Sequence, residues 1–332
     1  MTTNCTDNGC FNPTEKKLHL KEEDGWPDTW HEFDSESIWA IRAAMATGRP
    51  LLVRGEPGTG KSQLARAAAH VLERPLLYEV VNSRSEVTDL LYQFDAVARL
   101  ADAQLLGASN ADTEEVKKTL RPARYVRPGR VWWAINWASA QAQADVSSAA
   151  LPSAPADKWK NGCVLLVDEI DKADSELPNA LLECFANQRF QVPHLSMPVK
   201  GNEEQPAPLV MVTTNEEREL PGPFLRRCLV LKLTLPRDSE KLKAFLVQRG
   251  RVHFDEDYGR VDGYDKTLDK AAELLIQDRE SLGAGAIYRP GQAEYLDLCR
   301  AVFEIAAKHA CGNAMEVIEK VAGFTLRKNA DR

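Results

Sequence analysis

Five short apolar runs alternate with helical segments across the middle of this chain of 332 residues. The runs stay apolar from end to end and occupy residues 51–54, 76–81, 163–167, 209–214 and 228–233. Strands that are buried on both faces have this composition, and they belong to parallel sheets with helices on each face. The sequence therefore predicts an α/β fold around a five-stranded parallel sheet.

The strand pattern stops after residue 235, and the remaining segments read as amphipathic helices. We expect an α/β domain at residues 31–235, followed by a small all-helical domain at residues 236–332. Residues 1–30 are polar and show no periodicity, which predicts a flexible N-terminal arm. A stretch rich in Ala, Ser and Pro at residues 139–159 predicts a surface loop before the third strand.

Composition narrows the functions that the chain can perform. The chain has 42 basic and 49 acidic residues, and its net charge of −7 argues against a general nucleic-acid coat. No apolar run approaches the roughly 20 residues of a membrane span, and the first residues lack the order of a secretory signal, so we expect a cytoplasmic protein. Apolar surroundings or helical spacing predict buried positions for Cys163, Cys184, Cys228, Cys299, Trp132, Trp133 and Trp137.

The sequence GEPGTGKS at residues 55–62 joins the first predicted strand to a helix. Its glycines let successive backbone N–H groups turn toward phosphate oxygens, and the helix N-terminus adds partial positive charge. A lysine at position 61 would reach the β- and γ-phosphates, and the hydroxyl of Ser62 would bind Mg²⁺. The loop predicts a nucleoside triphosphate site formed by Gly55, Glu56, Pro57, Gly58, Thr59, Gly60, Lys61, Ser62 and Gln63.

The sequence VLLVDEIDKAD at residues 164–174 ends a predicted buried strand in two carboxylates. Asp168 stands where a carboxylate can hold the Mg²⁺ shell, and Glu169 is suited to orient and deprotonate an attacking water. We expect Asp171 and Asp174 to be solvated residues at the start of the next helix.

Two further candidates lie around the fourth and fifth strands. Asn215 follows the fourth strand, where its amide can contact the γ-phosphate or the water. Arg226 and Arg227 end a predicted short helix just before the fifth strand, and a guanidinium there can stabilise charge in the transition state.

These motifs together resemble the AAA+ ATPases, and within them the MoxR-like (dynein-related) branch. The resemblance covers about residues 30–330 and rests on GEPGTGKS, VLLVDEIDKAD, LVMVTTN and ELPGPFLRRC. SEVTDLLYQFDAVARL and YVRPGRVWWAINWA resemble the segments that flank the helix-2 insertion of the branch, here around residues 86–130, and FQVPH lies where the hairpin before the fourth strand belongs.

The resemblance implies a P-loop NTPase with a helical lid that hydrolyses ATP with Mg²⁺. It implies that Asp168 and Glu169 are the Walker B pair, that Asn215 is the sensor, and that Arg227 reaches into the site of a neighbouring subunit. The usual assembly is a hexameric ring that remodels a partner protein, often beside a von Willebrand factor A-type protein. By the same likeness Asn82 would restrain the Walker B glutamate.

One position departs from the family pattern. The second sensor of the family is an arginine at the start of a lid helix, and here that position falls near Ala293, with Arg289 close by. Two other functions stay open: a DNA-directed AAA+ motor or loader, which the acidic balance disfavours, and a slowly hydrolysing nucleotide-gated scaffold in a signalling or defence system.

Overall fold

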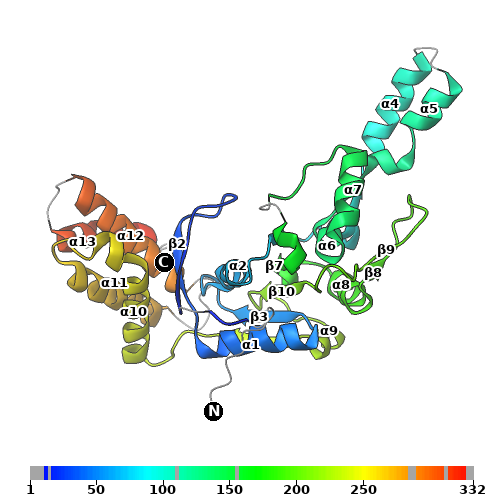
Figure 1. Ribbon diagram of the computed structural model, residues 1–332. Helices are drawn as coiled ribbons and strands as arrows, with labels where there is room; N and C mark the ends of the chain where they lie inside the picture. The colour runs from blue at the N-terminus through cyan, green and yellow to red at the C-terminus, as the bar shows by residue number, and fades with distance from the viewer. Residues whose placement is uncertain are drawn as a thin grey trace. The chain divides into compact units, whose positions relative to one another are not determined.

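The computed structural model describes residues 11–13, 16–108, 112–153, 157–282, 289–309 and 313–326. The chain forms two compact units, coloured by residue number in Figure 1. The first unit contains the described residues of 1–13, 35–54 and 65–231, and the second contains those of 14–34, 55–64 and 232–332.

A five-stranded sheet is the centre of the first unit. Its strands are β3 (Leu51–Gly55), β4 (Leu76–Val80), β7 (Val164–Asp168), β10 (Leu209–Thr214) and β11 (Leu229–Leu233). They lie in the order β11-β3-β10-β7-β4, and β10 runs parallel to both β3 and β7, as β4 does to β7. The predicted α/β fold and its strands are confirmed.

Burial explains why these runs are apolar throughout. Every residue of β7 and of β10 is buried, because both strands have neighbours on each side and helices flank the sheet. The flanking helices include α1 (Ser35–Thr47), α2 (Lys61–Val71), α8 (Glu176–Asn187) and α9 (Gly222–Arg227). The 3-10 turn η3 (Ile170–Lys172) follows β7 directly.

Residues 85–100 are one of the helical segments that the sequence predicts between the strands, and this prediction is wrong in the middle of the segment. The segment forms α3 (Val87–Leu91), then strand β5 (Tyr92–Phe94), then α4 (Ala96–Ala108). Aromatic residues favour strands, and β5 pairs antiparallel with β6 (Val126–Pro128), which outweighs the helical periodicity. Helices α4 and α5 (Thr113–Thr119) form a hairpin that projects from the sheet (Figure 1), and η1 (Pro122–Tyr125) leads back to β6.

The alanine-rich stretch is also different from the prediction. Its first half lies in α7 (Trp137–Ser147), which follows α6 (Arg130–Ile135). Of the described residues between α7 and η2 (Lys158–Asn161), 148–153 and 157 are not helical. Alanine is the strongest helix former, and the side chain of Asn136 caps α7 by accepting the backbone N–H of Ser139 at 2.9 Å.

The predicted core residues and the predicted hairpin are confirmed. Strands β8 (Arg189–Phe190) and β9 (Val199–Lys200) pair antiparallel before β10. The indoles of Trp133 and Trp137 meet edge to face at 4.9 Å between ring centroids, inside the core. All of the tryptophans and cysteines predicted to be buried are buried: Trp132, Trp133, Trp137, Cys163, Cys184, Cys228 and Cys299.

The second unit is helical, as the sequence predicts. It contains α10 (Ser239–Tyr258), α11 (Tyr264–Ser281), α12 (Gln292–His309) and α13 (Ala314–Thr325), whose apolar faces share one core. Of the described helices in the whole chain, none is long and apolar enough to cross a membrane.

A hairpin belongs to this unit as well, within the segment expected to be a flexible arm. Strands β1 (Lys17–Leu20) and β2 (Thr29–Glu32) pair antiparallel, so this part of the expected arm is structured, while residues 1–10 of the arm lie outside the described residues. The hairpin is held on α10, because Arg249 donates a hydrogen bond to the backbone oxygen of Glu32 at 3.0 Å and forms an ion pair with its carboxylate.

Candidate nucleotide site

Three neighbouring strands carry the predicted site residues to one edge of the sheet. Strand β10 lies between β3 and β7 and is parallel to both, so the carboxyl ends of all three meet at the same edge. The glycine-rich loop follows β3, Asn215 follows β10, and Asp168 ends β7. Crevices outside the carboxyl ends of such strands are where α/β proteins bind their ligands.

The loop between β3 and α2 has the backbone of a phosphate cradle. Gly58 has φ +76° and Gly60 has φ +87°, in the left-handed region that favours glycine. Lys61 begins α2, and its buried Nζ donates hydrogen bonds to the backbone oxygens of Gly55 at 2.8 Å and Glu56 at 2.9 Å. Thr59 Oγ1 donates to the same oxygen of Glu56 at 2.9 Å. The ammonium group of Lys61 thus lies inside its own loop, where it could bind a phosphate held by that loop.

Ser62 and Gln63 follow in the first turn of α2. The buried Oε1 of Gln63 has no hydrogen-bond partner among the described residues. The hydroxyl of Ser62 and the carboxylate of Asp168 are hard oxygen donors of the kind that Mg²⁺ prefers. Within the described ranges no group of three or more His, Cys, Asp or Glu side chains could hold a metal ion.

The loop belongs to the second unit, and residues from two helices of that unit pack on it. A Cβ placed on Gly58 would lie 2.8 Å from the Cβ of Ala293, so the start of α12 packs on the loop. Ala293, the position where the family has an arginine, is thus a contact that a longer side chain would disturb. Arg289 is exposed. Instead Arg279 of α11 reaches the loop, with its Nη2 3.2 Å from the Glu56 carboxylate, and sequence reasoning missed this residue.

Asp168 is buried and held by two hydroxyl groups. Thr213 Oγ1 donates a hydrogen bond to its Oδ1, and the Tyr78 hydroxyl donates to its Oδ2 at 3.2 Å. Burial, together with the charge of Asp168, raises the pKa of Tyr78 to about 12, so this hydroxyl remains a donor. The carboxylate is therefore fixed in direction, as a metal ligand needs to be.

Glu169 has a left-handed backbone, with φ +60° and ψ +43°, which is costly for a residue with a side chain. Its backbone N–H donates to Thr213 Oγ1 at 3.0 Å. Its carboxylate accepts from Lys172 Nζ at 2.7 Å and from Asn215 Nδ2 at 3.3 Å. The hydrogen bond with Glu169 raises the pKa of Lys172. The structure thus brings Asn215 to Glu169, a contact that the sequence analysis did not predict, and adds a lysine that it did not consider.

Asp171 corrects one expectation. It is buried rather than solvated, because its Oδ2 accepts the backbone N–H of Glu217 at 2.9 Å and so ties the turn after β7 to the loop after β10. Asp174 is exposed, as predicted. The exposed side chain of Asn82 accepts the backbone N–H of Arg84 at 2.8 Å, which closes its own turn. The structure gives no contact between Asn82 and Glu169 among the described residues.

Arg226 and Arg227 are exposed at the end of α9. Arg49, which precedes β3, donates hydrogen bonds to the backbone oxygens of Arg226 and Arg227, the latter at 3.0 Å. The two arginines therefore lie beside the amino end of β3, whereas the phosphate loop begins at its carboxyl end.

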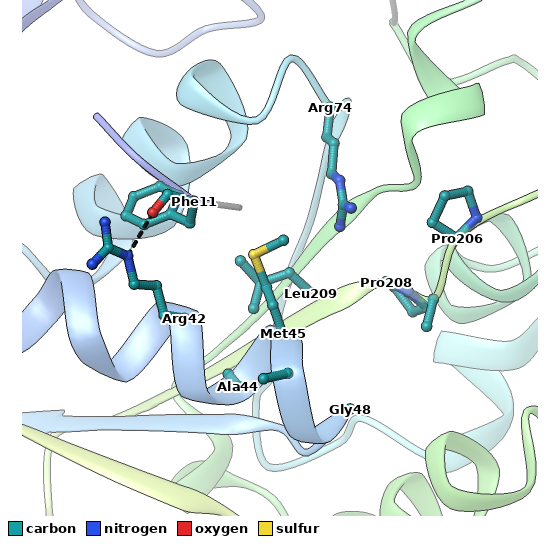
Figure 2. A pocket seen from close by; sticks show the side chains of 11 residues that line it. Phe11, Arg42, Ala44, Met45, Gly48, Arg74, Pro206, Pro208 and Leu209 are labelled. Carbon is teal, nitrogen blue, oxygen red and sulfur yellow. Dashed lines mark hydrogen bonds between the residues drawn. The ribbon is translucent and has the colours of Figure 1, made fainter. Parts of the chain in front are cut away.

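A separate pocket of about 330 Å³ lies in the first unit (Figure 2). Phe11, Met45, Arg74 and Leu209 are among its lining residues, and Arg42 at its side donates a hydrogen bond to the backbone oxygen of Phe11 at 2.8 Å. Arg74 and Leu209 precede or begin strands, so the pocket lies at the amino edge of the sheet. It contains none of the predicted site residues.

A strand, a glycine-rich loop and a helix that starts at its lysine, next to a carboxylate at the end of a parallel strand, define a P-loop nucleotide-binding domain. The chain belongs to the AAA domain family, dynein-related subfamily, whose model matches residues 50–249. The predicted family is confirmed.

Among solved structures, the chain is similar to a protein of Cytophaga hutchinsonii ATCC 33406 that is provisionally described as an ATPase. The two sequences are 15% identical over 87% of this chain and 79% of that chain, with a TM-score of 0.36. No curated protein matches the chain.

Proposed function

We propose that this chain binds ATP with Mg²⁺ at its P-loop and hydrolyses it, with Glu169 activating the water. The observation that supports the proposal is that β3, β10 and β7 are neighbours whose carboxyl ends lie at one edge of the sheet, where Asn215 bonds Glu169. Lys61 and Ser62 bind the phosphates and Mg²⁺, Asp168 supports the metal shell, and Asn215 orients the water or the γ-phosphate. Bound Mg²⁺ supplies positive charge that stabilises phosphoryl transfer.

We further propose that the chain works in a ring, usually of six subunits in such proteins, where Arg227 completes the site of a neighbour. Support comes from the exposed arginine pair at the amino end of β3, away from the start of the chain's own loop. Arg49 holds the backbone there, which gives a guanidinium a rigid base. Such arginines contribute roughly 10³–10⁵ in rate in related nucleotide hydrolases.

The use of the energy follows from the resemblance to MoxR-like proteins. We propose a chaperone-like role in which the ring remodels or activates a partner protein, such as one of the von Willebrand factor A type, in the cytoplasm. The hairpin of α4 and α5 supports this proposal, because exposed Val97, Leu100 and Leu105 on α4 offer apolar surface of the kind that binds proteins.

The central assignment is tested by Glu169→Gln. Turnover of ATP should fall on the order of a hundredfold or more, because the amide cannot accept the proton, while a fluorescent ATP analogue should still bind. Glu183→Gln is the matched control, since Glu183 is exposed on α8. Hydrolysis at the parental rate in Glu169→Gln would remove the base assignment.

The shared site is tested by mixing two inactive variants. Arg227→Ala should bind ATP but turn it over slowly, and Lys61→Ala should fail to bind it. In mixed rings an intact Arg227 can face an intact P-loop, so the mixture should recover some turnover. Mixed rings that form and stay inactive would contradict the role of Arg227, and an inactive Arg226→Ala would move it to the adjacent residue.

A further inference from the structure

Both carboxylate oxygens of Glu169 are engaged by neighbouring side chains. Lys172 Nζ lies 2.7 Å from Oε2, and Asn215 Nδ2 lies 3.3 Å from Oε1. Glu169 and Lys172 are three residues apart around the η3 turn, so the pair closes within one turn of backbone. While these contacts hold, neither oxygen of Glu169 is free to accept a hydrogen bond from a water.

Lys172 has other carboxylates near it besides that of Glu169. Glu217 and Asp171 also lie in its electrostatic neighbourhood. Oδ1 of Asp171 is buried without a hydrogen-bond partner in the part of the chain that the structure describes, although Oδ2 is engaged by the N–H of Glu217. A cation beside several carboxylates can leave one of them without becoming a buried unpaired charge, so release of Glu169 is not prohibitive.

We propose that Lys172 is a positioning residue that holds Glu169 in a resting state, and that this ion pair opens before water is activated. This inference rests on the proposed function, because it assumes that Glu169 is the base. Asn215 then has two roles in succession, first as the weaker restraint on the carboxylate and afterwards as the sensor of the nucleotide.

The size of the effect follows from exposure. The side chains of Lys172 and Glu169 are 37% and 30% exposed, so water screens the pair. Lys172→Met, which removes the charge and keeps the length, should raise the single-turnover rate of bound ATP between about 1.5- and 5-fold, with KM changed less than about twofold. Lys172→Arg should restore the restraint and return the rate toward the parental value.

A matched control is available in the same chain. Lys160 pairs with Asp157 at 3.0 Å, also three residues apart at a 3-10 turn, and Lys160→Met should leave the rate unchanged. A readout without turnover is a double-mutant cycle in melting temperature on the nucleotide-free protein, with Lys172→Met, Glu169→Gln and their combination. A favourable coupling is expected between the two residues.

The outcomes separate the two proposals. If Glu169→Gln retains the parental rate, the proposed base is wrong. If Glu169→Gln is inactive while Lys172→Met is unchanged or slower than the parent, the base is right and the resting pair is wrong. A cycle with no coupling would also overturn the resting pair.

Discussion

Acid should destabilise the second unit through two histidines that pack between the β1–β2 hairpin and α10. Burial, with the nearby charges of Arg249 and His253, lowers the pKa of His31 to about 3. Burial, with the charges of Arg300, Arg249 and Lys17, lowers the pKa of His253 to about 4. Nε2 of His31 is buried without a partner in the described structure, and Nδ1 of His253 lies 3.4 Å from Thr29 Oγ1. Both rings are therefore neutral in the folded protein.

The magnitude follows from proton linkage. A lowered pKa in the folded state means that stability is complete above about pH 6.5 and is lost as the pH falls toward the folded values. Between pH 7 and pH 5 these histidines bind protons in the unfolded chain but stay neutral in the folded unit. This difference lowers the free energy of unfolding by about 2 kcal/mol for each histidine. Because both folded values lie below 5, this figure depends little on their size. The upper bound for the pair is about 4 kcal/mol.

The assay is denaturation by urea at pH 7, 6 and 5, followed by the circular dichroism of the helices. Replacement of both His31 and His253 by Gln keeps neutral polar side chains and should remove most of the extra loss of stability at pH 5. His70→Gln, at an exposed position of α2, should behave as the parent does. An unchanged pH dependence in the double variant would refute the linkage argument.

Two further predictions concern packing. Gly58→Ala should weaken binding of a fluorescent ATP analogue about tenfold or more, because φ is +76° and the new Cβ would meet Ala293. Gly222→Ala, with open space around its Cβ, should leave the affinity unchanged. Equal affinities of the two variants would mean that the loop adapts to the new side chain. Trp132→Ala should cost about 3–5 kcal/mol of unfolding free energy in urea, since the indole is fully buried, and Trp39→Ala on the surface should cost far less; similar losses would contradict the core assignment.

The sheet and the phosphate loop could be predicted because their signals are local. An apolar run such as 209–214 has one stable environment, between two neighbouring strands, and the structure places it there. The loop at residues 55–62 has glycines where the backbone turns and a lysine where the helix starts. Neither inference needed knowledge of distant contacts.

The sequence predictions were wrong or incomplete where contacts between residues far apart in the sequence determine the structure. Tyr92–Phe94 is a strand because β6, more than thirty residues later, pairs with it. Asp171 is buried because the N–H of Glu217 needs an acceptor, and no local pattern announces that. Lys172 and Arg279 are ordinary helix-end cations in the sequence, and only the fold shows which carboxylate each one reaches.

The hydrogen bonds from Arg49 to the backbone oxygens of Arg226 and Arg227 couple these arginines to strand β3. Strand β3 connects Arg49, which precedes it, to the P-loop, which follows it, over five residues or roughly 15 Å of extended chain. Strand β3 is rigid, because it is hydrogen-bonded to β11 on one side and to β10 on the other. In the ring proposed above, where Arg227 completes a neighbour's site, a movement of the P-loop would be transmitted along β3 to the next subunit. Communication around such a ring would need no moving loop, only the rigidity of one strand.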